Sequence, residues 1–584
     1  MSNEPAAFRQ PVSDRPSRDR LDSWKEVASY VRYSERTVRR WEAEGLPVHR
    51  HTHKSKAAVY AYKSEIDAWW NRDRVRLEKL ELPVANKRKY WRLAGAVSAL
   101  AVVVAAVLVL STTRFLRARP AASPPHTIAV LPLHNLSGDA TQDYFADGIT
   151  DALTTDLAQM EDLQVISTTS AMHYSDTKKA LPEIARELKA DVIVEGSVER
   201  SGNNVRITAQ LIRAATDKHL WAETYERDLH DIVGLQDEVS SAIAQQIERQ
   251  LGGPKPSLLP QAGMVDPEAY DTYLRANYFL DSGQIAKSVD YYNQAAKLDP
   301  NYAPIYAHMA GAYFFQAFFG TLSPQEGWGK VKETATLAIE KDDRVAEAHG
   351  ALALAKMHYD WDFAGAEREF KRGIELNPSD ADIHHDYAHY LMAMGRTAES
   401  VAETKRAVEL NPLGGALTSC LCWHSFAARD YDDAVRLATA FLVRQPNNAW
   451  EHTILGWTYE QKRMPDEAVA QLQQAVAESN SRPFFLAALG HAYASAGRKR
   501  DAEQVLQTLS KRSKDSYVSA FDIGGIYAGL GDKEKAFFWL DKAATERSSF
   551  LVYSKWEPRL DPLRADPRFP QLLKRIGLPR QSER

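Results

Sequence analysis

The longest apolar stretch of the chain, LAGAVSALAVVVAAVLVL over residues 93–110, contains no charged or amide side chain. At about 1.5 Å per residue, a helix of this length measures about 27 Å, close to the roughly 30 Å hydrocarbon core of a bilayer. A helix buried in a globular domain usually keeps a polar stripe, and a cleaved signal peptide would place its apolar region within about the first 30 residues. The pattern therefore predicts one transmembrane helix over residues 93–110 and the lipid bilayer as a partner.

Positive charge is distributed unequally around this span. Eight Lys and Arg residues lie between Arg72 and Arg92, whereas three lie between Ser111 and Leu131. Because Lys and Arg accumulate on the cytoplasmic side of a membrane helix, we expect the N-terminal part in the cytoplasm and the larger C-terminal part outside it.

The N-terminal part shows helical spacing after a polar, proline-containing stretch over residues 1–20, which is typical of a disordered arm. Apolar positions predict one helix up to Val31, capped by Asp22 or Ser23, and a second helix from Ser34 to Glu42. Residues 45–47 (Gly-Leu-Pro) end the second helix. A small hairpin or wing is expected over residues 48–63, and a last helix follows over residues 65–70. This order is typical of a helix-turn-helix domain with a wing.

Residues 1–76 hold 16 Lys and Arg against 11 Asp and Glu, so this part is basic while the rest of the chain is acidic. Its motifs WKEVAxY, RTVRRWExEGLPVHRH and VYAYxSEIDAWW resemble the winged helix-turn-helix domains of the MerR and excisionase type. The resemblance implies that the second helix approaches bases or phosphates of double-stranded DNA and that the wing contacts the DNA backbone. The implied DNA-binding residues are Ser34, Arg36, Thr37, Arg39 and Arg40 in the helix, and Arg50, Lys54 and Lys56 in the wing.

Two other interpretations of this region were weighed. The arginines could form a solvated face of a protein-binding module. His49, His51 and His53 alternate, so on an extended strand they would project to one side and could hold a metal. Cationic wing residues near phosphate are the commoner explanation, and no Cys or acidic ligand lies near them in sequence. We expect no metal and no cofactor.

Alternating strand and helix patterns follow the span and predict an α/β layer domain over residues 127–253. Strands are expected at 127–132, 163–167, 191–198, 204–211 and 220–225, and helices at 144–160, 181–188 and 231–250. The motifs IAVLP, FADGITDAL, ADVIVEGSV and LWAETYER resemble the TolB-like or FlgO-like domain. Asp147, Asp151 and Asp156 could suggest a metal, but Asp147 and Asp151 are expected on a solvated helix face. The segment has no phosphate-binding glycine loop and no nucleophile with a paired base, so we predict that the protein is not an enzyme.

From about residue 266 the chain repeats with a period of 34 residues. Pro378 and Pro412 are 34 apart, and Ala434, Ala468 and Ala502 keep the same step. This period is that of tetratricopeptide (TPR) repeats, which stack helix pairs into a curved solenoid. We expect seven or eight repeats over residues 266–549, with an insertion at 320–328, a protein or peptide in the concave groove, and a capping helix and tail over residues 550–584.

Two cysteines and three histidines fall within the repeats. Cys422 occupies a small-residue position of a first helix, which predicts a buried packing residue, and Cys420 and Cys422 point to different faces, which argues against a disulfide between them. His384, His385 and His389 are expected to be ordinary surface histidines, with a pH sensor as the alternative.

A chain of 584 residues is expected to form several domains. The predicted order is the arm (1–20), the winged helix-turn-helix domain (21–76), a juxtamembrane linker (77–92), the span (93–110), a linker (111–126), the TolB-like domain, the TPR repeats and the cap. This order resembles the ToxR-type transmembrane one-component transcription regulators of bacteria, although the head is MerR-like.

The resemblance implies a single-pass inner-membrane protein with a cytoplasmic N-terminus and a periplasmic C-terminus. It would sense an extracytoplasmic signal, and a homodimer would place paired heads on two half-sites about 34 Å apart. The alternative is a membrane-anchored TPR scaffold for envelope protein complexes.

Overall fold

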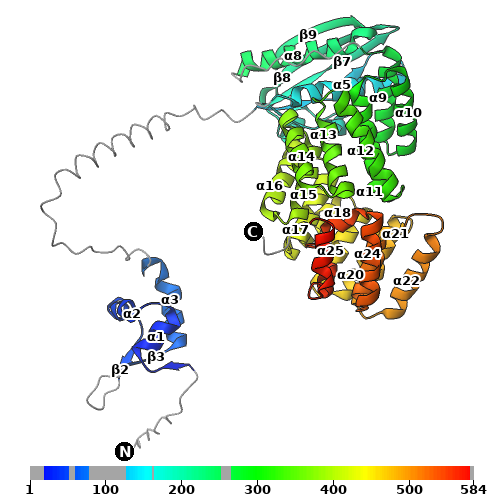
Figure 1. Cartoon of the computed structure of the whole chain (residues 1–584). Coiled ribbons are helices and arrows are strands. Elements are labelled where there is room, and N and C mark those ends of the chain that lie inside the picture. The colour runs from blue at the N-terminus through cyan, green and yellow to red at the C-terminus, as the bar shows by residue number, and fades with distance from the viewer. Residues whose placement is uncertain are drawn as a thin grey trace, which may run out of the picture. The chain divides into compact units, whose positions relative to one another are not determined.

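The computed structural model describes residues 19–50, 59–77, 126–160, 163–175, 177–251 and 265–578. The chain divides into two compact units, Met1–Arg119 and Pro120–Arg584 (Figure 1). The predicted arm, most of the juxtamembrane linker and the predicted span over residues 93–110 lie outside the described residues. Within the described ranges, no helix combines the length and the apolar composition that crossing a membrane requires.

The described residues of the first unit form three α-helices and a small antiparallel sheet. Its helices are α1 (Trp24–Val31), α2 (Glu35–Trp41) and α3 (Lys63–Leu77), and its strands are β1 (Arg20–Leu21), β2 (His49–Arg50) and β3 (Val59–Tyr62), in the order β1-β3-β2. Arg20 and Leu21 precede the first helix as a strand that was not predicted, and they pair with Tyr62 and Ala61. Ser23 caps α1, as expected, by accepting a hydrogen bond from the backbone N–H of Glu26.

A compact apolar core holds these elements together. Val27 of α1, Val38 and Trp41 of α2, and Ile66 and Trp69 of α3 are almost completely buried in it. The rings of Trp41 and Trp69 lie 6.0 Å apart. The core therefore fixes α2 against α1 and α3 and leaves the opposite side of α2 exposed.

The second unit begins with an α/β layer. Its strands are β4 (His126–Val130), β5 (His134–Asn135), β6 (Leu163–Val165), β7 (Val192–Ser201), β8 (Asn204–Arg213) and β9 (Lys218–Asp228). Its α-helices are α5 (Asp143–Ala158), α6 (Thr168–Ala171), α7 (Leu181–Leu188) and α8 (Ile232–Leu251). The sheet order is β6-β4-β7-β8-β9, with β5 paired to β7; β4 runs parallel to β6 and β7, and the last three strands are antiparallel.

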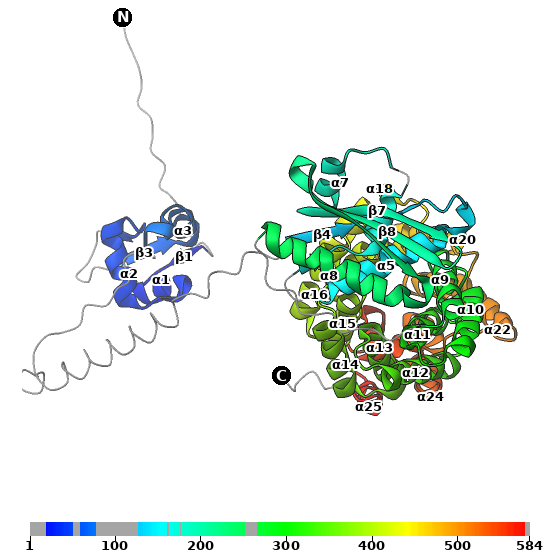
Figure 2. The same ribbon diagram turned by 90° about the horizontal axis from the view of Figure 1, so that it is seen from above.

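Alternating side chains pack the two faces of this sheet into separate cores. Ile128 and Val130 of β4 join the core formed with α5 and α8, whereas Ala129 joins the core formed with α7. Figure 2 shows α7 on the other side of the sheet from α5 and α8. The predicted strands and helices are confirmed here, with shifts of a few residues at their ends. The short helix α6 was not predicted.

Eight helix pairs follow the α/β layer. They are α9 (Pro267–Asp281) with α10 (Ile285–Leu298), α11 (Ala303–Phe318) with α12 (Pro324–Lys341), α13 (Ala346–Ala355) with α14 (Phe363–Leu376), α15 (Ala381–Met394) with α16 (Thr397–Leu410), α17 (Gly415–Ala427) with α18 (Tyr431–Arg444), α19 (Ala449–Gln461) with α20 (Pro465–Glu478), α21 (Pro483–Ser495) with α22 (Lys499–Arg512), and α23 (Ala520–Gly529) with α24 (Lys533–Glu546). The predicted insertion lengthens the second pair. These pairs confirm the helical repeat prediction.

The α/β layer and the helix pairs are joined through the edge strand β6. Ser379, between α14 and α15, hydrogen-bonds both the backbone N–H of Val165 and the carbonyl of Leu163. Between α16 and α17, Asn411 accepts a hydrogen bond from Ser170 at 2.6 Å. The solenoid therefore covers an edge that would otherwise expose unpaired backbone groups.

Candidate functional site

Helix α2 begins at a tight turn that follows α1. Arg32 adopts the left-handed conformation (φ 63°, ψ 38°) and ends α1. Ser34 then caps α2: its Oγ accepts a hydrogen bond from the backbone N–H of Thr37 at 3.2 Å and lies 2.8 Å from the Thr37 hydroxyl. Both hydroxyl side chains are thus engaged in shaping the first turn of α2, which positions the arginines that follow.

The arginines of α2 differ in their surroundings. Arg36 and Arg40 are exposed, and they occupy i and i+4 of one helix face. Arg39 lies 3.7 Å from Glu35 and its guanidinium stacks 5.3 Å from the Trp24 ring. Among the described residues, neither Arg36 nor Arg40 has an ion pair, so their charges are available to an anionic partner.

The predicted wing is described in part. Arg50 at the end of β2 forms an ion pair with Glu42 at 2.5 Å, and Lys54 and Lys56 lie outside the described residues. His49 of the proposed histidine triplet contacts Glu65 at 2.6 Å and stacks on Tyr60, while the other two histidines lie outside the described residues. The predicted DNA-binding residues other than Arg36 and Arg40 thus either have partners within the first unit or lie outside the described residues.

A cavity of about 500 Å³ lies where the α/β layer meets the first repeats. Tyr270, Tyr273 and Asn277 of α9 line it together with Asp151 and Asp156 of α5. Other residues that line it are Gln236, Asp237, Asp299, His308, Lys341, Asp342, Arg344 and Glu347. The lining is rich in carboxylates and hydroxyls, which suits a small polar molecule rather than an apolar one.

Burial changes the protonation of two carboxyl groups on α5. Desolvation, together with the charge of Asp237, raises the pKa of Asp156 to about 7, although a hydrogen bond from Ser240 at 3.0 Å opposes this. Desolvation and Asp143 raise the pKa of Asp147 to about 6. The expectation that Asp147 and Asp151 lie on a solvated face was wrong, because both are partly covered by neighbouring elements of the second unit.

The interior of the solenoid is occupied by the chain itself. We call residues 548–564, which follow α24, the C-terminal segment. Phe550 contacts the rings of Phe318, Trp423, Trp450 and Phe484, which come from α11, α17, α19 and α21. Because one short segment touches the first helices of several repeats, those helices face the inside of the curl. Within the predicted cap, residues 550–564 therefore lie inside the solenoid, whereas the helix α25 (Arg568–Arg575) packs against α24, the last helix of the repeats.

Further contacts extend along the same segment. Tyr553 lies against His358, His389 and Trp423, the first of these in η7 (Lys356–Asp360) after α13. Ser549 accepts a hydrogen bond from the Trp328 indole at 3.0 Å. The groove expected to receive a protein or peptide is thus filled, along these repeats, by residues of the same chain.

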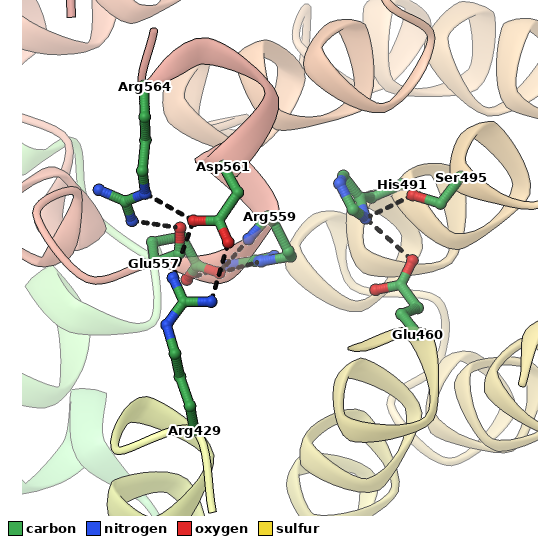
Figure 3. A network of polar contacts seen from close by, with 8 residues as sticks. All are labelled: Arg429, Glu460, His491, Ser495, Glu557, Arg559, Asp561 and Arg564. Carbon is green, nitrogen blue, oxygen red and sulfur yellow. Dashed lines mark hydrogen bonds and ion pairs between the residues drawn. The ribbon is translucent and has the colours of Figure 1, made fainter. Parts of the chain in front are cut away.

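Charged groups complete the interior of the solenoid (Figure 3). Arg559 holds Glu557 through two contacts of 2.9 Å and stacks 4.0 Å above the Trp457 ring, and both charged side chains are nearly inaccessible. Asp561 accepts two hydrogen bonds of 2.9 Å from Arg429, between α17 and α18.

A second buried pair lies nearby on the inner helices. His491 Nδ1 lies 2.9 Å from Glu460 and 3.4 Å from Ser495. Every charge in Figure 3 therefore has a partner of opposite sign or a hydrogen-bonding group within the second unit.

The histidines of α15 are not surface residues, in contrast to the expectation. His384 and His389 are buried, and His384 contacts Glu403 at 2.6 Å. His385 is partly buried and faces Cys420 of α17. Cys420 and Cys422 form no disulfide, and Cys422 is buried, both as predicted; Cys420 is buried as well. The Cys420 sulfur contacts His385, whereas the Cys422 thiol contacts the carbonyl of Thr418.

Comparison with known protein families matches two parts of the chain. Residues 124–242 match the second domain of the HilA/YgeH-like transcriptional regulators. Residues 273–302, 424–483 and 459–521 match tetratricopeptide repeats, which confirms that prediction. The chain therefore contains tetratricopeptide repeats and a segment similar to the second domain of these transcriptional regulators.

Whole-protein comparisons give partial likenesses. A Rhizobium meliloti (strain 1021) protein named "Putative adenylate cyclase 3" is 35% identical over 247 residues, which are 40% of this chain and 42% of that protein. The chain thus spans less than half the length of this relative. Among solved structures, the APC/C hetero-tetramer Cut9–Hcn1 is 15% identical over 45% of this chain and 47% of that chain, with a TM-score of 0.33. A tetratricopeptide repeat protein of Parabacteroides merdae ATCC 43184 is 12% identical over 47% of this chain and 98% of that chain, with a TM-score of 0.31.

Proposed function

We propose that the protein is a membrane-anchored, DNA-binding transcriptional regulator whose α2 helix enters the major groove. The observation that carries the proposal is the exposed pair Arg36 and Arg40 on one face of a helix whose other face is packed. The match to a transcriptional-regulator domain supports the same function. In this proposal the MerR-like head binds double-stranded DNA and the TolB-like and TPR parts respond to a signal.

The two arginines suit this task better than their neighbours. Two unpaired guanidinium groups one helical turn apart can reach a guanine edge and a phosphate, which are common arginine contacts in the major groove. Arg39 supports α2 by stacking on Trp24. Arg50 is held by Glu42 and would contact the backbone of the DNA only after that ion pair opens.

Membrane anchoring rests on the apolar run over residues 93–110 and its flanking charges. We propose a single span with the DNA-binding unit in the cytoplasm and the solenoid in the periplasm. The accessibility of a cysteine at each terminus to a labelling reagent, measured in intact cells, tests this orientation. Labelling of both ends from the same side, or release of the protein without detergent, would contradict it.

Signal reception is proposed for the second unit. The C-terminal segment fills the interior of the solenoid, so a peptide would have to displace it, whereas the 500 Å³ cavity beside α5 and α9 offers space for a small polar molecule. A ligand that changed self-association would bring two heads onto two half-sites about 34 Å apart. Sedimentation of the full chain with and without its operator tests the homodimer.

We propose that the chain regulates transcription without catalysis. The name of the Rhizobium meliloti relative describes a protein of which this chain matches 42%, and no catalytic motif was found in the sequence. Incubation of the purified full chain with ATP and a divalent cation should yield no cyclic AMP above that of a buffer blank. Production of cyclic AMP at a rate proportional to protein concentration would contradict this part of the proposal.

DNA binding is tested by gel shift with genomic fragments at several salt concentrations. The full chain in detergent should bind with an affinity that falls steeply as salt rises, since phosphate contacts release counterions. Arg36→Ala combined with Arg40→Ala should weaken binding by 10-fold or more and lower the salt slope by about one, because one of the two arginines contacts a phosphate and the other a base in this proposal. Arg500→Ala, an exposed arginine on α22, serves as the matched control and should bind as the wild type does. Equal binding by all three proteins would refute the assignment to α2.

A further inference from the structure

Three potential metal-ligand atoms converge between α15 and α17. His385 Nε2 lies 2.9 Å from His389 Nε2 and 2.8 Å from Cys420 Sγ, and His389 Nε2 lies 3.6 Å from the same sulfur. All three atoms fit within 4.8 Å of one another. The group is separate from α2 and from the cavity beside α5, and nothing described so far accounts for it.

A chain of hydrogen bonds determines which nitrogen of His389 carries its proton. Thr404 donates its hydroxyl proton to the carbonyl of Ser400, and Ser400 donates its own to the carbonyl of Ala388, both at 2.8 Å. These hydroxyls can therefore only accept from His424 Nδ1, which lies 2.6 Å from Thr404 and 3.3 Å from Ser400. It follows that His424 Nδ1 carries a proton.

The same reasoning extends to the next ring. His424 Nε2 is then an acceptor for a neutral ring, and its neighbour at 3.2 Å is His389 Nδ1, which must donate. The remaining nitrogen, His389 Nε2, is left with a lone pair aimed at His385 and Cys420. An imidazole whose far nitrogen is fixed by a hydrogen bond is the usual arrangement of a metal ligand.

His385 is held in a comparable way. Its Nδ1 lies 3.5 Å from a carboxylate oxygen of Asp386, which favours a proton on Nδ1 and a lone pair on Nε2. Three electron-pair donors would then face one another without a positive centre between them. A single shared proton is one way to relieve this repulsion, and a cation is the other.

The distances between the three ligand atoms fit a bound cation after a small movement of one side chain. Metal–nitrogen bonds of about 2.0–2.1 Å and metal–sulfur bonds of about 2.3 Å at tetrahedral angles place two nitrogens about 3.3 Å apart, and a nitrogen and a sulfur about 3.6 Å apart. The distance from His389 Nε2 to the Cys420 sulfur, 3.6 Å, already matches. His385 is too close to both partners by less than about 1 Å, and its side chain is 19% exposed, so the ring has room to move back.

We propose that His385, His389 and Cys420 bind one borderline or soft cation, Zn²⁺ or Cu⁺. Two imidazole nitrogens and a thiolate are the donor set that these ions select, whereas Mg²⁺ and Ca²⁺ require oxygen ligands. The site lies beneath the C-terminal segment, whose Tyr553 ring faces His389. The cation would therefore link the fourth and fifth repeats at the point where the segment covers them.

The test uses the full chain in detergent, stripped with a chelator and titrated with Zn²⁺ or, under reducing anaerobic conditions, with Cu⁺. One equivalent of at least one of these ions should bind. Cys420→Ser should weaken binding by at least 100-fold, whereas Cys422→Ser, the matched control two residues away, should bind as the wild type does. His424→Leu removes the hydrogen-bond acceptor behind His389 and should weaken binding by 10- to 100-fold.

Co²⁺ provides a readout that does not depend on the folding of Cys420→Ser. A thiolate-to-cobalt charge-transfer band in both the wild type and Cys422→Ser would identify Cys420 as the ligand. Absence of this band, together with no stoichiometric binding of Zn²⁺ or Cu⁺, would overturn the proposal and leave a shared proton as the explanation. Binding that survives Cys420→Ser unchanged would also overturn it.

Discussion

Charged side chains have opposite surroundings on the exposed face of α2 and in the interior of the solenoid. On α2, Arg36 and Arg40 are exposed and have no ion pair among the described residues, while the opposite face of the helix is packed. Inside the solenoid, Glu557 and Arg559 are nearly inaccessible and hold each other through two hydrogen bonds. An exposed charge without an ion-pair partner can bind a group of another molecule, whereas a buried charge needs a partner from the same chain.

This contrast identifies where the molecule can bind and where it cannot without rearrangement. The first helices of the repeats present aromatic side chains to the solenoid interior, but the C-terminal segment already contacts them. The first unit offers charges with no such occupant. On the proposed function, the first unit is therefore the region that binds a partner, whereas residues of the same chain fill the solenoid interior.

The largest expected effect comes from Phe550, the aromatic anchor of the C-terminal segment. Phe550→Ala leaves a cavity among rings from four helices and should lower the free energy of unfolding of the second unit by about 3–5 kcal/mol. Phe538→Ala on α24 is the matched control, since this ring is 65% exposed and its loss should cost less than about 0.5 kcal/mol. Urea unfolding followed by circular dichroism measures both. Equal midpoints for the two variants would mean that the segment does not stabilise the interior.

The buried ion pair should show the next largest effect. Arg559→Ala leaves the carboxylate of Glu557 buried without its partner, at a cost of roughly 3 kcal/mol. Arg575→Ala breaks an exposed contact of 3.2 Å with Asp541 and should cost no more than about 1 kcal/mol. Equal destabilisation by the two substitutions would mean that Glu557 and Arg559 are accessible to water.

The raised pKa of Asp156 predicts that the stability of the protein depends on pH. The folded protein keeps a proton on Asp156 up to about pH 7, whereas an unfolded chain releases it near pH 4. The folded state therefore binds more protons between these values, and the stability falls as the pH rises through this range. Asp156→Asn should stabilise the protein by about 1–3 kcal/mol at pH 8 and change little at pH 4. The test is the difference in melting temperature between the two proteins at pH 4 and pH 8, which should be present only at the higher pH.

The smallest effect concerns the cap of α2. Ser34→Ala should cost about 1 kcal/mol in the first unit because the backbone N–H of Thr37 loses its acceptor, and Ser34→Asp should restore most of this stability. On the proposed function, the same Ser34→Asp should weaken DNA binding, since a carboxylate would face phosphates. Thermal melts of both variants measure the capping role of Ser34, and gel shifts measure its effect on DNA binding. If Ser34→Asp bound DNA as the wild type does, Ser34 would lie away from the DNA.

Much of the fold follows from local patterns in the sequence. The alternation in residues 204–211 and the turn at Gly202 predict the hairpin of β7 and β8, and the 34-residue period predicts the helix pairs. These features depend on neighbours in sequence or on a constant repeat, so a single chain reveals them. The packed and outward faces of α2 follow from the spacing of Val38 and Trp41 in the same way.

The interior of the solenoid could not be predicted by these rules. Phe550 and Tyr553 follow the last repeat and meet helices up to about 230 residues earlier in the chain, a contact that no local period encodes. The His385, His389 and Cys420 group was also missed. The available signal was that His385 and Cys420 lie 35 residues apart, close to one repeat, so that they occupy nearly the same place in adjacent repeats.

The central claim is that α2 binds DNA through its two exposed arginines, Arg36 and Arg40. Genome-wide DNA capture with the full-length protein in membranes tests it most directly, when the wild type is compared with the Arg36→Ala, Arg40→Ala double variant at equal abundance. We predict discrete enriched sites for the wild type that disappear in the variant. The same sites at the same strength in both proteins, or no enriched site in either, would contradict the claim.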